Sequence, residues 1–173
     1  MTMSRLIKSA HLLIDSFANQ LIMRILLQRV SHAQVAIAGS VHSEIGQGFL
    51  ILLGIEEADD QDDIDFLCKK VAQIRLFNDA EGVMNLSLQE VEGSLMVVSQ
   101  FTLYASTKKG NRPSYIRAAR PEKAIPLYEA FVQRLQELTQ KPVATGVFGA
   151  DMQVSLCNDG PVTILIDSKM RDF

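Results

Sequence analysis

The stretch that most constrains the fold is residues 94–105, SLMVVSQFTLYA, in which a continuous apolar run passes directly into polar residues. Residues 95–98 are all apolar, which is typical of a strand whose two faces are both covered. Ser99, Gln100 and Thr102 then supply two hydroxyls and an amide. A core strand that ends in uncharged hydrogen-bonding groups predicts a prepared site at its end. The alternative is an ordinary strand that simply reaches solvent.

The size and composition of the chain indicate one domain with an appendage. Of its 173 residues 47% are hydrophobic, which is enough for a substantial core. The formal charge of -3 argues against a protein that grips nucleic acid over a large surface, but not against one that touches its end. Cys68 and Cys157 lie in apolar segments, so we expect reduced core thiols in a cytoplasmic protein. The three histidines are too scattered to predict a metal site.

Residues 1–22 are predicted to be an extension that precedes the domain of residues 23–173. The extension has helical apolar spacing, but Asp15 and Asn19 interrupt it, and no span approaches the roughly 18 uncharged residues of a membrane helix. Its basic and Ser residues also fit an amphipathic targeting peptide. We favour Met23 as the true start, with the preceding residues an extended reading frame or a loose helix.

An acidic run at residues 56–65 marks the start of the first predicted helix. It carries seven carboxylates but lacks the glycine and the terminal glutamate of a calcium loop. Carboxylates cap free N–H groups and oppose the dipole at a helix N-terminus. Ile64, Leu67, Cys68 and Val71 follow at helical spacing, which predicts an amphipathic helix to about Arg75.

The one basic stretch of note lies between the polar strand end and the second predicted helix. Residues 108–123 contain six basic side chains and one acidic side chain, a local charge of +5. Such a loop is well placed to meet phosphates, although surface loops also carry Lys and Arg for solubility. Residues 121–140 form the second helix, with Pro121 in its first turn. Its predicted buried stripe consists of Leu127, Phe131, Leu135 and Leu138.

The order of elements predicts an α+β fold. Strands follow Met23, and the region after the second helix consists of strands broken at Gly146, at Gly149 and at residues 158–161. The order is therefore strands, helix, strands, helix, strands. This order predicts a compact single domain with one mainly antiparallel sheet or half-barrel and two main helices.

The side chains at SQFTLY (residues 99–104) and NDGPVT (residues 158–163) limit the chemistry. Neither segment contains His, Cys, Lys or Glu, so no base accompanies a Ser or Thr nucleophile there. Hydroxyls, an amide and a Gly-Pro backbone suit the holding of a substrate and the donation of hydrogen bonds to a developing oxyanion. An enzyme of this kind needs a substrate that is already activated or that brings its own catalytic group.

Together, SQFTL at residues 99–103 and NDGPVT at residues 158–163 resemble the two signature motifs of the D-aminoacyl-tRNA deacylases. The similarity extends over about residues 23–166 and includes MRILLQRV, GFLILLGI, the NRPS loop and ADMQVSL. The resemblance implies a homodimer of α+β subunits with barrel-like sheets. It also implies that the Gly-Pro pair of one subunit enters the pocket of the other.

The resemblance also implies roles for individual residues. Ser99, Gln100 and Thr102 would line the pocket on the strand, while Gly160 and Pro161, joined by a cis bond, would face the substrate Cα. The residues expected to bind substrate or to brace the site are Phe101 and Met152 around the terminal adenosine, Arg29 behind the Gly-Pro loop, and Arg112 in the basic loop.

The implied reaction is hydrolysis of the ester bond of D-aminoacyl-tRNA, and of glycyl-tRNA, at the acceptor end of the tRNA. Main-chain atoms would exclude an L side chain, and the 2′-OH of the terminal ribose would assist attack by water. No cofactor, metal, membrane or DNA partner is expected. The alternatives are a covalent Thr102 nucleophile, an editing enzyme for another mischarged tRNA, and a non-catalytic RNA-binding module.

Overall fold

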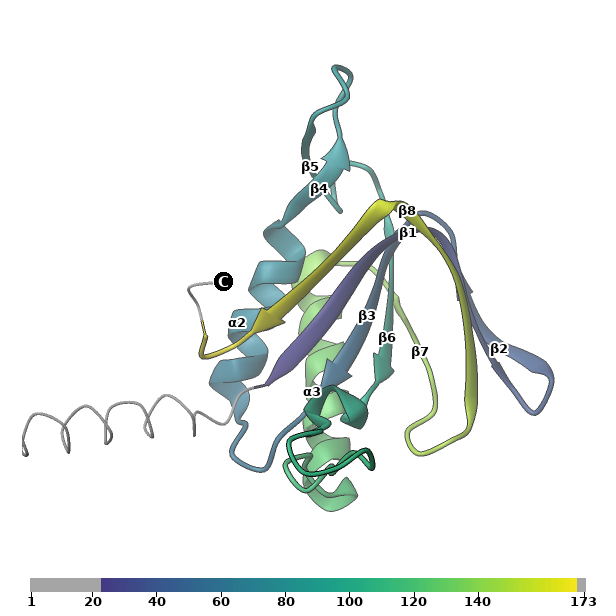
Figure 1. Ribbon diagram of the computed structural model, residues 1–173. Helices are drawn as coiled ribbons and strands as arrows, with labels where there is room; N and C mark the ends of the chain where they lie inside the picture. The colour runs from purple at the N-terminus through teal and green to yellow at the C-terminus, as the bar shows by residue number, and fades with distance from the viewer. Residues whose placement is uncertain (1–22, 171–173) are drawn as a thin grey trace, which may run out of the picture.

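The computed structural model describes residues 23–170, so the predictions for residues 1–22 lie outside the described residues. In this range the chain forms a curled sheet with two helices packed on one of its faces (Figure 1). The helices are α2 (Gln61–Gln73), α3 (Pro121–Thr139) and the short 3-10 helix η1 (Phe101–Tyr104). The strands are β1 (Arg24–Ile37), β2 (Ser40–Ile45), β3 (Gly48–Gly54), β4 (Arg75–Asn78), β5 (Met84–Ser87), β6 (Ser94–Ser99), β7 (Val143–Thr145) and β8 (Met152–Asp167).

The main sheet of the described chain has the order β2-β1-β3-β6-β7, and β8 pairs along the other edge of β1. The long strand β1 is antiparallel to β2, β3 and β8, which confirms the α+β prediction of a mainly antiparallel sheet. By contrast, β6 runs parallel to both of its neighbours, β3 and β7. The chain crosses over through α2 before β6 and through α3 after it, as parallel pairing requires.

Two apolar clusters lie on opposite faces of the sheet. The larger cluster fills the space between the sheet and the helix pair α2 and α3. The smaller cluster lies on the other face, where β8 and β2 curl around β1, and includes Val30, Val35, Leu50, Met96 and Val98. Both faces of β6 are therefore covered, which explains why residues 95–98 are apolar without alternation.

The acidic run caps α2, as predicted. Asp60 is the N-cap residue and Asp63 the third helical residue, and their side chains form a reciprocal capping box with the backbone. The helix ends at Gln73 rather than at the predicted Arg75, because Arg75 already belongs to β4, which pairs with β5. Cys68 is buried on the inner face of this helix, as expected.

Helix α3 also begins where the sequence predicted, with Pro121 in its first turn. Phe131 and Leu135 are fully buried, but Leu127 and Leu138 are only half-buried. Ala124 and Tyr128 take the more deeply buried positions, and the Tyr128 hydroxyl donates to the Val97 carbonyl of β6 at 2.8 Å. The stripe that faces the sheet is therefore rotated from the predicted one.

Two predictions for the region of β8 were wrong. We expected a strand break at residues 158–161, but β8 pairs with β1 on both sides of residues 159–162, which form a bulge between the pairs Val30–Asn158 and Gln28–Thr163. The Asn158 side chain closes the bulge, because its Oδ1 accepts from the Val162 N–H at 2.7 Å. Cys157 was predicted to be a core thiol and is exposed on this strand, since the outer face of β8 carries no covering layer within the described chain.

The described residues contain no helix that is long and apolar enough to cross a membrane.

Candidate active site

The polar end of β6 does not continue as a strand. We predicted that residues 99–102 would line a pocket as part of the strand, but β6 ends at Ser99 and Phe101 begins the 3-10 helix η1. The neighbouring strand β3 ends at Gly54, so no further ladder is available beyond this point. Gln100 lies between β6 and η1, and its N–H donates to the carbonyl of Leu53 in β3 at 2.8 Å. The motif is therefore a strand end joined to a tight helical turn.

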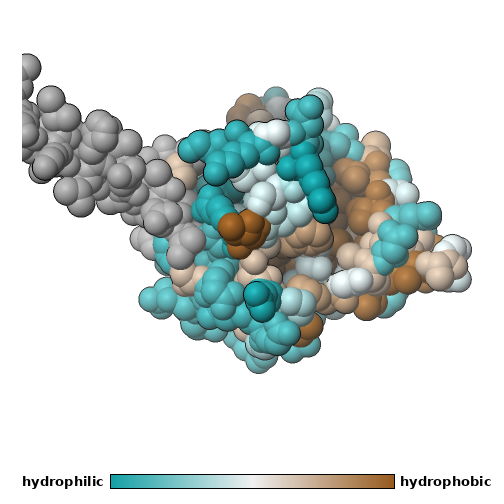
Figure 2. Space-filling view, turned by 60° about the horizontal axis from the view of Figure 1, so that its bottom comes forward, coloured by the Kyte–Doolittle hydropathy of each residue, from teal (hydrophilic) through white to brown (hydrophobic). Residues whose placement is uncertain are grey.

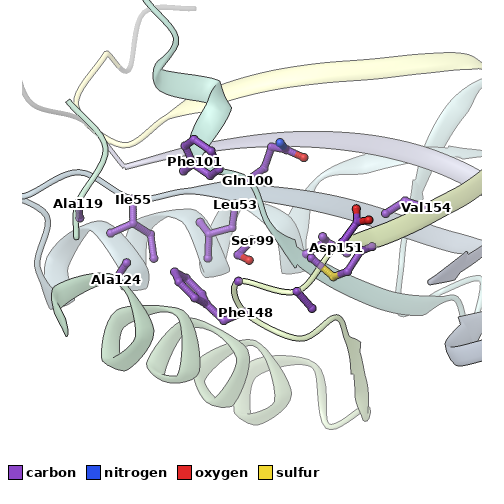
Figure 3. A pocket seen from close by; sticks show the side chains of 14 residues that line it. Leu53, Ile55, Ser99, Gln100, Phe101, Ala119, Ala124, Phe148, Asp151 and Val154 are labelled. Carbon is purple, nitrogen blue, oxygen red and sulfur yellow. The ribbon is translucent and has the colours of Figure 1, made fainter. Parts of the chain in front are cut away.

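A cavity of about 320 Å³ opens at this strand end (Figure 3). Four of the predicted site residues line it, namely Ser99, Gln100, Phe101 and Met152. Thr102 lies next to them but is not a lining residue, and its hydroxyl accepts a hydrogen bond from Gln100 Nε2. The other lining residues are Leu53, Ile55, Val98, Ala119, Ala124, Phe148, Gly149, Ala150, Asp151 and Val154.

Several lining residues were not predicted from the sequence. Phe148 and Asp151 come from the connection between β7 and β8, and Figure 3 shows Phe148 entering the cavity opposite Ile55 and Leu53. Asp151 is the one ionisable side chain among the lining residues. The signal in the sequence was Gly149, a residue typical of turns. In the structure its φ is +76°, and the turn brings the residues on both sides of it to one end of the sheet.

The lining residues determine which chemistry the cavity can support. They include no His, Lys or Cys, so Asp151 is the one lining side chain that could serve as a base for the Ser99 hydroxyl. The walls are otherwise apolar, apart from the Gln100 amide, the Asp151 carboxylate and backbone groups. Such a cavity can exclude water, orient a substrate and offer hydrogen-bond donors to a developing oxyanion.

Gly160 and Pro161 do not line the cavity of their own chain. They lie in the bulge of β8, are exposed, and are joined by a cis peptide bond, as the resemblance implied. Gly160 has φ +134°, and a Cβ atom at this position would lie 2.9 Å from Arg29 Nη2. The described chain therefore does not bring the two signature motifs together within one subunit.

Arg29 lies directly behind this bulge. It is buried, and its Nε donates to the Asp159 carbonyl at 2.9 Å and lies 3.4 Å from the Asp159 carboxylate. Its Nη1 donates to the Leu76 carbonyl. The predicted contact between Arg29 and the Gly-Pro loop is therefore present, and it ties the bulge to the strand β4.

A network of charged side chains lies under η1. Arg24 donates to the Leu103 carbonyl at 2.9 Å and forms an ion pair with the buried Asp167 at 2.8 Å. Arg24 and Arg117 both lie over the Tyr104 ring. Burial raises the pKa of the Tyr104 phenol above its ordinary value, so the phenol remains protonated. Glu56 lies at 0% exposure and accepts a 2.7 Å hydrogen bond from Arg117 Nε.

The basic loop is attached to the same end of the molecule. An isolated bridge pairs Ser106 with Ser114, and a second bridge pairs Ala118 with Glu56, which follows the end of β3. Arg112, predicted to bind substrate, is exposed in this loop and does not line the cavity. Figure 2 views the molecule from this end and shows hydrophobic residues in a depression between hydrophilic rims.

Comparisons with known proteins point to one family. The family model described as D-Tyr-tRNA(Tyr) deacylase matches residues 26–167. Proteins named D-aminoacyl-tRNA deacylase are similar over 150 residues, 87% of this chain and 100% of theirs. One is from Akkermansia muciniphila (61% identical) and one from Bacteroides thetaiotaomicron (59%).

Two solved structures have a similar fold. One, described as c-Myc DNA Unwinding Element Binding Protein, has 36% identity and a TM-score of 0.77, and the match covers 83% of this chain and 97% of that chain. The other is described as a probable eukaryotic D-amino acid tRNA deacylase. It has a TM-score of 0.74 over 84% of this chain and 99% of that chain, and its identity of 17% supports the fold alone. From the family match over most of the chain and the high identity to the curated relatives, we conclude that the chain belongs to the D-Tyr-tRNA(Tyr) deacylase family.

Proposed function

We propose that this protein hydrolyses the ester bond of D-aminoacyl-tRNA and releases the D-amino acid and the tRNA. The observation that carries the proposal is the cavity at the end of β6, with Ser99, Gln100 and Phe101 on its wall, in a chain that is about 60% identical to proteins named D-aminoacyl-tRNA deacylase. An aminoacyl ester is an activated substrate, so a lining without His, Lys or Cys suits it. The proposed site of action is the cytoplasm, where charged tRNA is used.

The proposal includes a homodimer with the active site at its interface. In support, Gly160 and Pro161 are exposed and lie outside the cavity of their own chain. The outer edge of β8 pairs with no other strand among residues 23–170, and a long unpaired edge is a favourable surface for association. Insertion of the Gly-Pro bulge of one subunit into the cavity of the other would complete each site.

Chiral selection would follow from this insertion. The main chain of Gly160 and Pro161 would lie against the substrate Cα and leave room for hydrogen but not for an L side chain. A D side chain would point away, so every D-amino acid would be accepted, and glycine as well. This is specificity by exclusion of the wrong substrate rather than by recognition of the right one.

The catalytic step would use few protein groups. Backbone N–H groups at the Ser99–Thr102 turn would stabilise the oxyanion, and the 2′-OH of the terminal ribose would assist attack by water on the ester carbonyl. The bond between the ester carbonyl carbon and the ribose 3′ oxygen then breaks. The released 3′ oxygen takes up the proton of the attacking water. Phe101 and Met152, both lining residues, would hold the terminal adenosine.

The nucleic-acid partner is proposed to be the acceptor end of tRNA. The formal charge of the chain is -3, and the +5 loop at residues 108–123, which carries Arg112, lies beside the cavity. This distribution supports contact with one end of a nucleic acid rather than with a long duplex. The similar protein with 36% identity is named for binding to a DNA unwinding element, so a DNA competitor belongs in the test.

The test compares hydrolysis of D-Tyr-tRNA, L-Tyr-tRNA and Gly-tRNA by the full chain, without added metal. We expect rapid loss of the D ester and of Gly-tRNA, with the L ester spared, and no inhibition by duplex DNA at equal concentration. Equal rates on both enantiomers would contradict the exclusion mechanism, and no hydrolysis of any ester would favour an RNA-binding module. The same assay on a chain that begins at Met23 tests the predicted domain boundary, and light scattering tests the dimer.

A further inference from the structure

A second hollow lies in the basic loop, outside the cavity already described. Its volume is about 310 Å³, which lies within the size range of small-ligand sites. Its lining residues are Ser106, Lys108, Lys109, Ser114, Ile116 and Arg117. Two ammonium groups, a guanidinium and two hydroxyls around one hollow form a set of donors suited to a phosphate.

The lysines of this hollow have no charged partner in the part of the chain that the structure describes. Within residues 23–170, neither Lys108 nor Lys109 takes part in an ion pair, and both are exposed. Arg117 is held by Glu56 through its Nε. The positive charge of the lysines is therefore directed to solvent, where it can attract an anion.

An aromatic pair connects this hollow to the main cavity. Tyr115 lies between the lining residues Ser114 and Ile116 in sequence, and its ring makes an edge-to-face contact with Phe101, with 5.1 Å between the ring centroids. Phe101 lines the main cavity. Tyr115 is 38% exposed and Phe101 56% exposed, so aromatic surface remains open to a ligand on both rings.

Ile116 adds exposed apolar surface at the same place. It is 85% exposed, the highest value among the large hydrophobic side chains of the described residues, and it lies between the basic residues Arg112 and Arg117. An exposed apolar side chain next to an aromatic ring and to cations is a combination that suits the flat face of a nucleobase with its phosphate.

From these contacts we infer a second nucleotide subsite, formed by Tyr115 and the hollow of residues 106–117, for the nucleotide immediately 5′ to the aminoacylated nucleoside. The inference rests on the proposed function, because it extends the same substrate by one nucleotide. The base stacks on Tyr115 beside Ile116, and the phosphate that links the two nucleosides meets Lys108 and Lys109. Stacking on an aromatic ring does not depend on base identity, so the subsite accepts any base.

Two properties of the loop keep this subsite in position relative to the cavity. Ala119 N–H donates to the Ile55 carbonyl at 2.9 Å, and both Ala119 and Ile55 line the cavity. Glu56, the next residue, bridges to Ala118 and accepts from Arg117. The loop is thus attached at the cavity wall, so a ligand that spans both hollows meets two surfaces joined by these contacts.

The test compares a substrate that extends into the proposed subsite with one that ends at the aminoacylated nucleoside. One is D-Tyr-tRNA, and the other is adenosine esterified with D-tyrosine, which lacks the preceding nucleotide. KM and kcat are measured for the full chain and for Tyr115→Ala, Tyr115→Leu and the double variant Lys108→Gln with Lys109→Gln. Met84→Ala, which removes an exposed apolar side chain from β5, serves as the matched control.

We expect Tyr115→Ala to raise KM for D-Tyr-tRNA about 10-fold, the range of one lost base stack, with kcat and the kinetics of the adenosine ester unchanged. Tyr115→Leu keeps apolar bulk against Phe101 but has no π face, so it should raise KM nearly as much. The double lysine variant should raise KM for tRNA and flatten its dependence on salt, because phosphate contacts release counterions. Met84→Ala should leave KM and kcat unchanged for both substrates.

Three results would overturn the inference. The first is an equal loss on both substrates, which would mean that Tyr115 only supports Phe101. The second is full recovery in Tyr115→Leu, which would show packing rather than stacking. The third is no change in KM for tRNA in any variant. An unmodified protein that hydrolyses neither substrate would instead contradict the proposed function, so the two failures are distinguishable.

Discussion

Arg117 Nε lies 2.7 Å from Glu56 Oε1, and this ion pair joins the basic loop to the end of β3. The Glu56 side chain is fully buried, whereas Arg117 is 45% exposed. A buried carboxylate that loses its charged partner remains costly to hold away from water. The pair therefore determines where the loop sits relative to the cavity.

We predict that Arg117→Met lowers the free energy of unfolding by about 2 kcal/mol, because the Glu56 carboxylate stays buried without the guanidinium. Glu56→Gln should lower the free energy of unfolding by less, because it leaves no buried charge. Urea unfolding of the two single variants and of the double variant measures the coupling. Additive effects would mean that the pair contributes no net interaction.

From the backbone conformation of Gly160 we predict that one added methyl group lowers both stability and activity. Its φ is +134°, and a Cβ would lie 2.8 Å from Val162 Cγ2 and 2.9 Å from Arg29 Nη2. We expect Gly160→Ala to destabilise the protein by about 1–3 kcal/mol and to lower hydrolysis of D-Tyr-tRNA at least 10-fold. Gly46→Ala is the control, because no atom lies within 4 Å of its Cβ position and its φ is not positive. Equal behaviour of the two variants would contradict this account.

Arg29 should matter for both stability and activity. Arg29→Met removes its hydrogen bonds to the Asp159 and Leu76 carbonyls, so we expect a loss of about 3 kcal/mol in unfolding free energy and a lower kcat/KM for the D ester. Arg134→Met is a matched control on α3, where the guanidinium forms surface ion pairs that are worth less than about 1 kcal/mol. Thermal unfolding and the deacylation assay give both readouts. If Arg29→Met leaves both unchanged, the loop does not depend on it.

Asp59 predicts a pH dependence of stability. Its side chain is buried at the start of the acidic run, one oxygen accepts from the Glu56 N–H at 2.7 Å, and Oδ1 has no hydrogen-bond partner within residues 23–170. Burial raises the pKa of the Asp59 carboxyl to about 7. An acid whose pKa is higher in the folded state binds its proton more tightly there. The contribution of Asp59 to stability is therefore greatest below its unfolded pKa near 4 and falls as the pH rises toward 7.

The size of this effect is up to about 4 kcal/mol between pH 4 and 7, from the difference between the two pKa values. Asp59→Asn removes the titrating group and should flatten the fall. Urea unfolding across this pH range in both proteins provides the measurement. An unchanged slope in Asp59→Asn would show that other groups cause the dependence.

Thr102 tests the catalytic proposal. Its hydroxyl accepts from Gln100 Nε2 and does not line the cavity, so we expect it to position Gln100 rather than to attack the ester. Thr102→Val should lower kcat/KM about 10-fold through misplacement of the amide, and Thr102→Ser should restore most of it. Mass spectrometry of the enzyme during turnover is the second readout. An acyl group trapped on Thr102 would establish the covalent mechanism instead.

Local physical chemistry determined much of this protein. The capping carboxylates at Asp60 and Asp63, the apolar run at residues 95–98 and Pro121 at the start of α3 each act over a few residues, so the sequence predicted them correctly. The residues of each motif are consecutive in the chain, so both motifs could be recognised from the sequence, and the family match over residues 26–167 confirms the family. The end of β6 was less predictable, since whether a strand continues depends on the strands beside it.

Only the tertiary structure decided what surrounds the site. Phe148 and Asp151 reach the cavity because the connection from β7 to β8 returns to the end of β6, a contact between segments about 50 residues apart. The bulge at residues 159–162 exists because Arg29 and Asn158 hold it while β8 keeps its pairing with β1. Such contacts join distant residues through packing and hydrogen bonds that no short stretch of sequence contains. The sequence alone therefore indicated the family and the chemistry, and the fold decided which residues share the cavity.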